Sequence, residues 1–381
     1  FTYPGSVNAI GFDGVSTGFA PNYPLTNTAV TGVIGNAQEG WYSDPGPFPD
    51  GVIFRNDVLR TDEQLGVFGE VTFDLNEQFS LVLGARWYDI EVDLKGSANS
   101  SFFNLGQTDD AQAFGTNISA QFAPDNSVGA PDKAATDGTI FKVTLDWRPT
   151  DDHMVYATVS EGFRPGLLNR PGGAAGPNNF TVPYALDTDD VTNIEFGTKS
   201  SFLGNTLQFN SSLFFVDIER LQTTIFDPSI VNLFFSDNAA DAEVRGIEGN
   251  FIWLPQAADG WTVAGAFSLL DTEITNVITP TNDVLKGDEL AFAPGFQGNL
   301  RARYEWAFGD NGWLGHVMPS VSFSSDSGIT AGITTETWSA ELVVTNLTDE
   351  RAEVSRNFVF DARRISYVQP RTIGVRMSWD F

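Results

Sequence analysis

Very few side chains in this sequence of 381 residues could support covalent or metal chemistry. The chain has no cysteine, and its only histidines are His153 and His316. Thiol catalysis and clusters of metal-binding cysteines are therefore excluded. We find no Ser-His-Asp motif, no phosphate-binding loop and no persuasive pair of catalytic carboxylates. We therefore expect no catalytic residue and no enzymatic activity.

The acidic segment Asp187-x-Asp189-Asp190 offers the hard oxygen ligands that calcium prefers. It lacks the glycine and the distal glutamate of a calcium loop, so a solvated acidic turn is the favoured interpretation and no metal site is assigned. The chain has 49 acidic and 21 basic residues and a net charge of −28, which argues against nucleic-acid binding. A divalent cation at acidic outer loops is the one cofactor that this charge leaves open.

Two kinds of side chain could bind a substrate. Arg164 and Arg170 could meet an anionic ligand, although an ion pair that anchors a loop is the simpler interpretation. Aromatic residues in expected loops could hold a substrate by stacking or apolar contact, and packing within the loops explains them equally well. These aromatic residues are Trp41, Tyr42, Phe102, Phe103, Phe180, Tyr184, Phe234 and Phe235.

The elements that must position these residues are strands. In segment 371–381 every second residue is apolar, and the residues between are small or polar. A period of two predicts a strand with one apolar face and one wet face. Such an edge at the end of a soluble protein would promote aggregation. A closed barrel in a bilayer has no free edge, and its apolar face meets lipid.

The same alternation recurs along the chain, with connections that are short and long in turn. Segment 296–308 is the clearest, with Leu300 and Tyr304 on one face and Arg301 and Arg303 on the other. We expect about thirteen strands, each long enough to cross a bilayer, which takes about ten residues. No run of 18 apolar residues is present, so a helical membrane protein is excluded.

Several local features refine this outline. The apolar positions change parity after Trp87, which predicts either a bulge or the point where the strand leaves the membrane. Tryptophan is favoured at membrane interfaces, and eight of nine fall at expected strand ends. They are Trp87, Trp147, Trp253, Trp261, Trp306, Trp313, Trp338 and Trp379. Long connections are expected at about 93–138, 164–190, 221–242, 272–295 and 348–369.

Seven segments, in order from about residue 64 to the end, resemble those of the TonB-dependent outer-membrane receptors. They are Val67-Phe68-Gly69-Glu70, Leu83-Gly84-Ala85-Arg86-Trp87, Tyr156-Ala157-Thr158-Val159-Ser160-Glu161-Gly162-Phe163-Arg164, Asn193-Ile194-Glu195-Phe196-Gly197-Thr198-Lys199, Val244-Arg245-Gly246-Ile247-Glu248, Asn346-Leu347-Thr348-Asp349-Glu350-Arg351 and Pro370-Arg371-Thr372-Ile373-Gly374. Each segment is weak evidence alone, but their common order and spacing make the set strong.

The resemblance implies an all-β fold, a transmembrane antiparallel barrel of about 22 strands, with an N-terminal plug in its lumen. Residues 66–381 would be the C-terminal part of the barrel, and residues 1–65 an extracellular loop region leading into it. The plug is absent from this chain. The family imports scarce nutrients, such as siderophore-bound iron, cobalamin or oligosaccharides, with energy relayed by TonB.

The same resemblance places the chain in the bacterial outer membrane, with its C-terminus in the periplasm. Expected partners are the TonB system acting through the plug, outer-membrane lipid and lipopolysaccharide, the barrel-assembly machinery, and a small-molecule or oligosaccharide substrate. Lumen-facing charges would contact the plug or substrate, or form a hydrated ladder of ion pairs. They are Lys142, Asp146, Arg148, Glu195, Lys199, Glu248, Arg301, Arg303, Glu305 and Arg376. Gly374, Met377, Trp379 and Phe381 match the C-terminal assembly signal of such barrels.

Two alternatives remain open: a passive porin-like channel, and a soluble β-rich binding protein or glycosidase. One departure from the family also stands out. Only five residues separate Phe323 from Ile329, where the family has a longer loop. We expect a descending strand at 329–333, too short to cross the bilayer core, and therefore a break in the chain between Ser325 and Ile329.

Overall fold

The computed structural model describes residues 31–32, 54–100, 114–170, 172–176, 179–226, 234–280, 284–309, 311–323, 326–351, 353–359 and 362–379. One described helix, α1 (Ile118–Gln121), is four residues long, and no helix of the described residues could cross a membrane. The remaining elements are strands. The described chain is therefore almost entirely β structure, as the alternation predicted.

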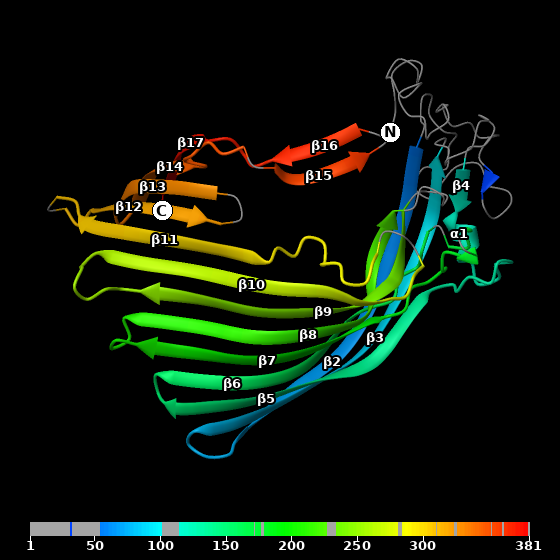
Figure 1. Cartoon of the computed structure of the whole chain (residues 1–381), viewed down its shortest axis with the longest axis horizontal. Coiled ribbons are helices and arrows are strands. Elements are labelled where there is room, and N and C mark those ends of the chain that lie inside the picture. Colours follow the sequence, from blue (N-terminus) through cyan, green and yellow to red (C-terminus); the bar gives the residue numbers. More distant parts are fainter. Residues whose placement is uncertain are drawn as a thin grey trace.

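Fifteen strands form one sheet, and two more form a separate hairpin. In the sheet, β1 and β4 are short and lie beside the end of β3, and the other thirteen strands follow one another as antiparallel neighbours (Figure 1). The strands are β1 (Thr31–Gly32), β2 (Phe54–Asp74), β3 (Phe79–Ser100), β4 (Phe114–Asn117), β5 (Ala134–Thr150), β6 (His153–Arg164), β7 (Asp189–Phe202), β8 (Leu207–Phe226), β9 (Phe234–Trp253), β10 (Trp261–Val277), β11 (Phe296–Ala307), β12 (Leu314–Ser322), β13 (Asp326–Thr334), β14 (Trp338–Thr345), β15 (Glu353–Val359), β16 (Ala362–Tyr367) and β17 (Thr372–Trp379).

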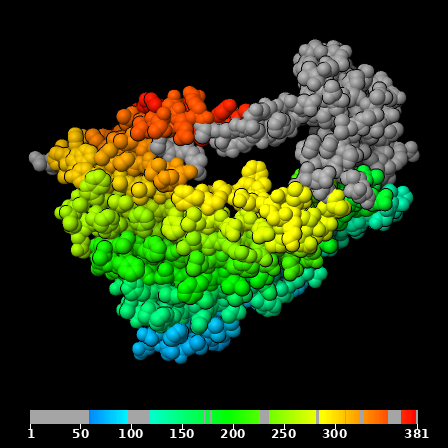
Figure 2. Space-filling model, in the orientation of Figure 1, coloured from blue at the N-terminus to red at the C-terminus, as the bar shows by residue number. Residues whose placement is uncertain are grey.

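The two ends of the thirteen-strand wall differ. Tight turns such as 75–78, 151–152 and 203–206 join the strands at one end, here called the short-turn end. Most of the extended connections gather at the other, the long-loop end, where β2 and β3 project furthest (Figure 1). Within the described residues β2 and β17 pair on one side only, so the wall is open (Figures 1 and 2).

The two faces of the wall also differ. Along β5, Phe141, Val143, Leu145 and Trp147 are exposed, while Thr144 between them is buried. Their neighbours in register continue the same exposed apolar face, here called the apolar face, across the wall. The opposite face, called the polar face, carries the intervening side chains. Leu300 is 42% exposed and shares the apolar face with Gly265 and Val321, its partners in register. The membrane orientation expected for segment 296–308 stays a prediction.

Aromatic rings gather at the short-turn end. Trp261 and Tyr304 lie 5.1 Å apart between ring centroids, and Trp313 and Trp338 lie 5.7 Å apart. The tryptophans at this end are Trp147, Trp253, Trp261, Trp306, Trp313, Trp338 and Trp379. Trp87 was wrongly expected at a strand end: it lies within β3, because that strand continues to Ser100.

Folded loops cover the polar face at the long-loop end. Tyr88, Ile90, Val92 and Leu94 are buried there, on the face opposite Trp87, against residues of the segments 114–133 and 165–188. We call the described residues of these two segments the cap. A second apolar core joins Ala174 and Val182 of the cap to the ends of β8, β9 and β10. The change of parity after Trp87 is therefore not a bulge, since β3 pairs without a register shift with both β2 and β5.

Several expected boundaries were wrong. β2 begins at Phe54, so residues 54–65, expected in a loop, belong to a strand. The expected connections 93–138 and 221–242 are partly strand, because β3, β5, β8 and β9 run far past the apolar band. The 20 residues of β8 span about 66 Å when extended, roughly twice the hydrocarbon core of a bilayer. Connection 348–369 contains the hairpin of β15 and β16.

The expected break between Ser325 and Ile329 is also wrong. Asp326, Ser327 and Gly328 are part of β13, and each pairs with β12 in continuous register, from Ser322↔Asp326 onward. β13 has nine residues rather than five and pairs with β14 along its other side.

Candidate functional site

The ten charged residues expected to face a lumen occupy the polar face of the wall. Glu195 and Lys199 alternate with exposed Ile194 and Phe196 on β7, and Arg301 and Arg303 alternate with Leu300 on β11. The same parity holds, through the strand register, for Lys142, Asp146, Arg148, Glu248, Glu305 and Arg376.

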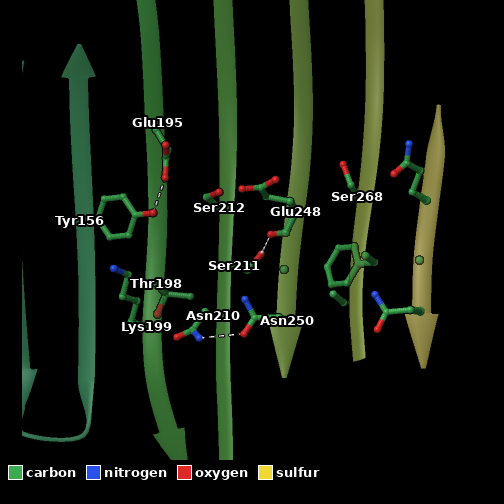
Figure 3. Close-up of a pocket in the computed structure, with 16 residues that line it drawn as sticks. Tyr156, Glu195, Thr198, Lys199, Asn210, Ser211, Ser212, Glu248, Asn250 and Ser268 are labelled. Atoms are coloured by element: carbon green, nitrogen blue, oxygen red, sulfur yellow. Dashed lines mark hydrogen bonds between the residues drawn. The ribbon is translucent and has the colours of Figure 1, made fainter. Parts of the chain in front are cut away.

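A depression of about 470 Å³ lies in the middle of the polar face, across β6 to β11 (Figure 3). It is lined by uncharged polar groups, including Asn210 and Asn250, whose amides are bonded at 3.0 Å, and by the charged residues Glu195, Lys199 and Glu248. The hydroxyl of Tyr156 donates to Glu195, and Lys199 lies over the Tyr156 ring, 5.8 Å from its centroid (Figure 3). The side chains that line the depression are therefore mostly polar, and several of them interact with one another.

A glycine makes this arrangement possible. Gly197 is the direct neighbour of Tyr156 in register, and a Cβ at Gly197 would lie 2.4 Å from the tyrosine ring. The ring therefore lies flat across the β7 backbone, which places the phenol beside Glu195. The sequence analysis named Tyr156 and Gly197 in segments that resemble the family, but it did not predict that they are in contact.

Other charges on the polar face are paired with one another. Lys142 Nζ lies 3.3 Å from Glu70 Oε2 across Gly84, and Arg303 lies 2.7 Å from Glu305. These pairs are between one third and one half exposed, so each contributes little to stability. They match the hydrated ladder of ion pairs better than a dedicated binding site.

A buried histidine lies on the same face near the short-turn end. The His316 side chain is 2% exposed, and its Nε2 is 3.3 Å from Glu341 Oε1, while Arg376 Nη1 is 3.3 Å from the other oxygen of Glu341. Gly332 separates His316 from Glu341 in register and leaves the space between them open. This cluster ties β12, β14 and β17 together.

At the long-loop end, Arg164 forms an ion pair that joins the ends of β6 and β7, between which the cap segment 165–188 runs. Its Nε donates to Asp189 Oδ2 at 2.5 Å, and its backbone N–H donates to Asp189 Oδ1 at 2.7 Å. Asp189 is 1% exposed. Gln222 completes the network by donating to the carbonyl oxygens of Pro165 and Asp187, each at 2.9 Å. The loop-anchoring interpretation of Arg164 is the one that this geometry supports.

Two carboxylates and one backbone N–H of the acidic segment 187–190 make similar contacts. Asp189 accepts from Arg164, Asp190 pairs with Arg220, and the backbone N–H of Asp187 donates to Asn238. Among the described residues no group of three or more His, Cys, Asp or Glu side chains could hold a metal ion.

Arg170, the other candidate for an anionic ligand, is different. Its Nε is buried and has no hydrogen-bond partner among the described residues. Burial lowers the pKa of the Arg170 guanidinium below its ordinary value. The side chain thus places a desolvated cation inside the cap.

The aromatic candidates divide between packing and regions outside the description. Phe235 is 2% exposed and packs against Phe180, with ring centroids 5.6 Å apart, and Tyr184 packs against the core under the cap. These contacts favour a packing role. Trp41, Tyr42, Phe102 and Phe103 lie outside the described residues, as does the side chain of Phe234.

Sequence reasoning missed the polar residues that hold the cap. Gln121, Asn169, Gln222 and Asn238 are uncharged, follow no periodic pattern and lie far apart in the chain. Asn169 joins the cap to β9, since its Nδ2 donates to Ser236 O at 2.7 Å, and Asn238 of β9 bonds to the backbone of Asp187 in the cap. No local signal in the sequence identifies such contacts.

The C-terminal strand matches the expected signal in part. Met377 and Trp379 are 74% and 65% exposed on the apolar face of β17, and Gly374 faces the opposite side beside Val343. Phe381 lies outside the described residues.

Several solved structures have a fold similar to that of this chain. The ferric yersiniabactin uptake receptor FyuA from Yersinia pestis is similar with a TM-score of 0.62 and 16% identity, over 85% of this chain and 46% of that one. The copper transporter OprC is similar with a TM-score of 0.59 and 15% identity, over 84% and 50%. The ferripyoverdine receptor of the outer membrane of Pseudomonas aeruginosa is similar with a TM-score of 0.56 and 16% identity, over 88% and 40%.

The chain therefore spans about half the length of these receptors, and at such identities the likeness concerns the fold. A family model described as TonB dependent receptor-like, beta-barrel, matches residues 2–379. The apolar face is accordingly the lipid face of a transmembrane barrel, and the polar face lines its lumen. This chain belongs to the TonB-dependent receptor family.

Proposed function

We propose that the complete protein is an outer-membrane receptor that actively imports a scarce nutrient with energy relayed by TonB. The observation that carries the proposal is the cap. Its two segments are folded over the polar face of the wall and rest on buried apolar cores, and hydrogen bonds of Gln222 and Asn169 fix the segment 165–188 to β8 and β9. An ordered cap at one end of the lumen suits capture of a specific ligand, because a rigid site loses little entropy on binding.

Siderophore-bound iron, cobalamin and oligosaccharides are the candidate classes of cargo. The similar proteins include receptors for ferric yersiniabactin and ferripyoverdine and a copper transporter, which favours a metal complex. The long-loop end would then face the cell exterior and the C-terminus the periplasm. Lipid, lipopolysaccharide and the barrel-assembly machinery are the further partners of such a protein.

Uptake in cells tests this proposal. Cells that produce the complete receptor are given labelled ferric complexes, cobalamin and oligosaccharides, with the TonB protein present or deleted. We expect accumulation of one class only, and its loss without TonB. Equal accumulation in both strains would identify a passive channel instead.

A further inference from the structure

Three strands at the C-terminal end of the wall carry one ionisable side chain each. His316 is the only such residue of β12, Glu341 the only one of β14 and Arg376 the only one of β17. All three lie in one row of the register, since Gly332 of β13 pairs with His316 on one side and with Glu341 on the other, and Glu341 pairs with Arg376. We call these three residues the ionisable row.

The members of the ionisable row are in contact across four strands. One carboxylate oxygen of Glu341 lies 3.3 Å from His316 Nε2, and the other lies 3.3 Å from Arg376 Nη1. The contact with His316 crosses β13 at Gly332, where a Cβ would lie 2.9 Å from Glu341 Cγ. The glycine therefore allows one carboxylate to meet both neighbours.

The apolar pattern of β14 and β17 does not fix how these two strands align. A slip of one residue would move the apolar side chains to the wrong face, but a slip of two residues keeps every side chain on its face. Tight hairpin turns normally fix the register of neighbouring strands. β14 and β17 are instead joined by the long connection 346–371, which contains the hairpin of β15 and β16.

A slip of two residues would disturb the aromatic rings at the short-turn end. It would move β17 by about 7 Å along β14. Trp379 pairs with Trp338 in register, and Trp338 lies 5.7 Å from Trp313 between ring centroids. The slip would take Trp379 out of line with these two rings.

We propose that the ionisable row sets the register of β17. Arg376 lies directly opposite a carboxylate in one alignment only, because a slip of two residues would place Glu341 opposite Gly374 or Ser378. His316 is a positioning residue, since it contacts the same carboxylate from the other side. The Arg376 and Glu341 side chains are 71% and 20% exposed, so their pair contributes little to stability. A weak interaction can still select one of two alignments that are otherwise similar in free energy.

Disulfide crosslinking in the complete receptor, in isolated outer membranes, reports this register directly. Val343→Cys with Gly374→Cys reports the observed alignment, since these residues pair in register. Val343→Cys with Thr372→Cys reports a slip of two residues in one direction. Thr345→Cys with Gly374→Cys reports a slip in the other. The last two pairs are diagonal neighbours about 7–8 Å apart, too far for a disulfide, so only the first pair should crosslink without further substitutions.

Arg376→Met should raise crosslinking of the two slipped pairs about fivefold, the change in population that corresponds to an interaction of about 1 kcal/mol. Arg376→Lys keeps the cation and should not raise it. His316→Leu should give a smaller rise, because the pair of Glu341 with Arg376 remains. Arg303→Met is the matched control, since Arg303 pairs with Glu305 within β11 and should leave the register of β17 unchanged.

Exchange of the two charges separates their pairing from a general structural role. Glu341→Arg together with Arg376→Glu should recover the alignment lost in Glu341→Arg alone, and should recover folded receptor where a single variant does not fold. An unchanged register in Arg376→Met, or an exchange variant that slips or misfolds as the single variants do, would overturn the proposal. Slipped crosslinks in Asn346→Ala but not in Arg376→Met would show that the connection sets the register, and would overturn it as well.

Discussion

Single residues of the wall act through the face they occupy. Leu300 faces lipid, and Arg301, one residue later, faces the lumen. Moving a cation to the lipid face near mid-bilayer costs about 2–4 kcal/mol. We expect Leu300→Arg to reduce folded receptor in the outer membrane strongly and Arg301→Leu to leave it nearly unchanged. The measurement is the folded fraction in isolated outer membranes, and equal yields would contradict the assigned faces.

Glycines on the polar face act by making room for aromatic rings. Gly197→Ala should push the Tyr156 ring away from the β7 backbone and break its contact with Glu195, at a cost of about 1–3 kcal/mol for an overpacked site. Gly84→Ala is the matched control, because Gly84 pairs with Lys142 on the polar face and a Cβ there would make only ordinary contacts, the nearest at 3.6 Å. Unfolding in denaturant should separate the two variants, and equal midpoints would show that the ring contact contributes nothing.

At the scale of elements, a single asparagine organises the connection between β14 and β17. Asn346 is 3% exposed and adopts a φ of 48°, which asparagine tolerates better than most residues. Its amide donates to Glu350 O and Gln369 O and accepts from the Glu350 N–H, each at 2.8 Å. The backbone N–H of Arg371 donates to Asp349 and, with Arg351 nearby, holds the pKa of that carboxyl below its usual value.

Asn346→Ala should therefore release this connection. The variant leaves buried partners unsatisfied, at about 1–3 kcal/mol, and retains the positive φ. Limited proteolysis between residues 347 and 371 should accelerate clearly relative to wild type. Asn346→Gly relieves the backbone but also loses the bonds, so its cleavage rate should fall between those of wild type and Asn346→Ala. Wild-type rates in both variants would exclude the anchoring role.

The strands also differ in how well the sequence predicted them. Alternation found the strands where one face meets lipid, as in β5, β11 and β17, because only there do apolar and polar residues alternate cleanly. Past the apolar band, both faces of β8 and β9 meet water or cap residues, so 221–226 and 234–242 read as loop. The parity switch after Trp87 coincides with the residues of β3 that pack under the cap, but the sequence did not reveal the anchors of the cap, such as Gln222 and Asn169, because these depend on contacts between distant segments.

At the scale of the whole molecule, thirteen strands form a wall that has a short-turn end and a long-loop end. The count and the antiparallel order followed from the sequence, whereas the folding of 114–133 and 165–188 over the lumen did not, because it depends on burial between loops. The shared apolar cores make the cap part of the wall.

The orientation of this wall is tested most directly by cysteine labelling, since these 381 residues contain no cysteine of their own. Single cysteines replace Asp125 and Leu285 at the long-loop end, and Glu77 and Asp151 at the short-turn end, all exposed positions. Intact cells that produce the complete receptor are treated with a membrane-impermeant maleimide. We predict labelling of the first pair at once and of the second pair only after the outer membrane is permeabilised. Immediate labelling of positions 77 and 151, with 125 and 285 protected, would contradict the account.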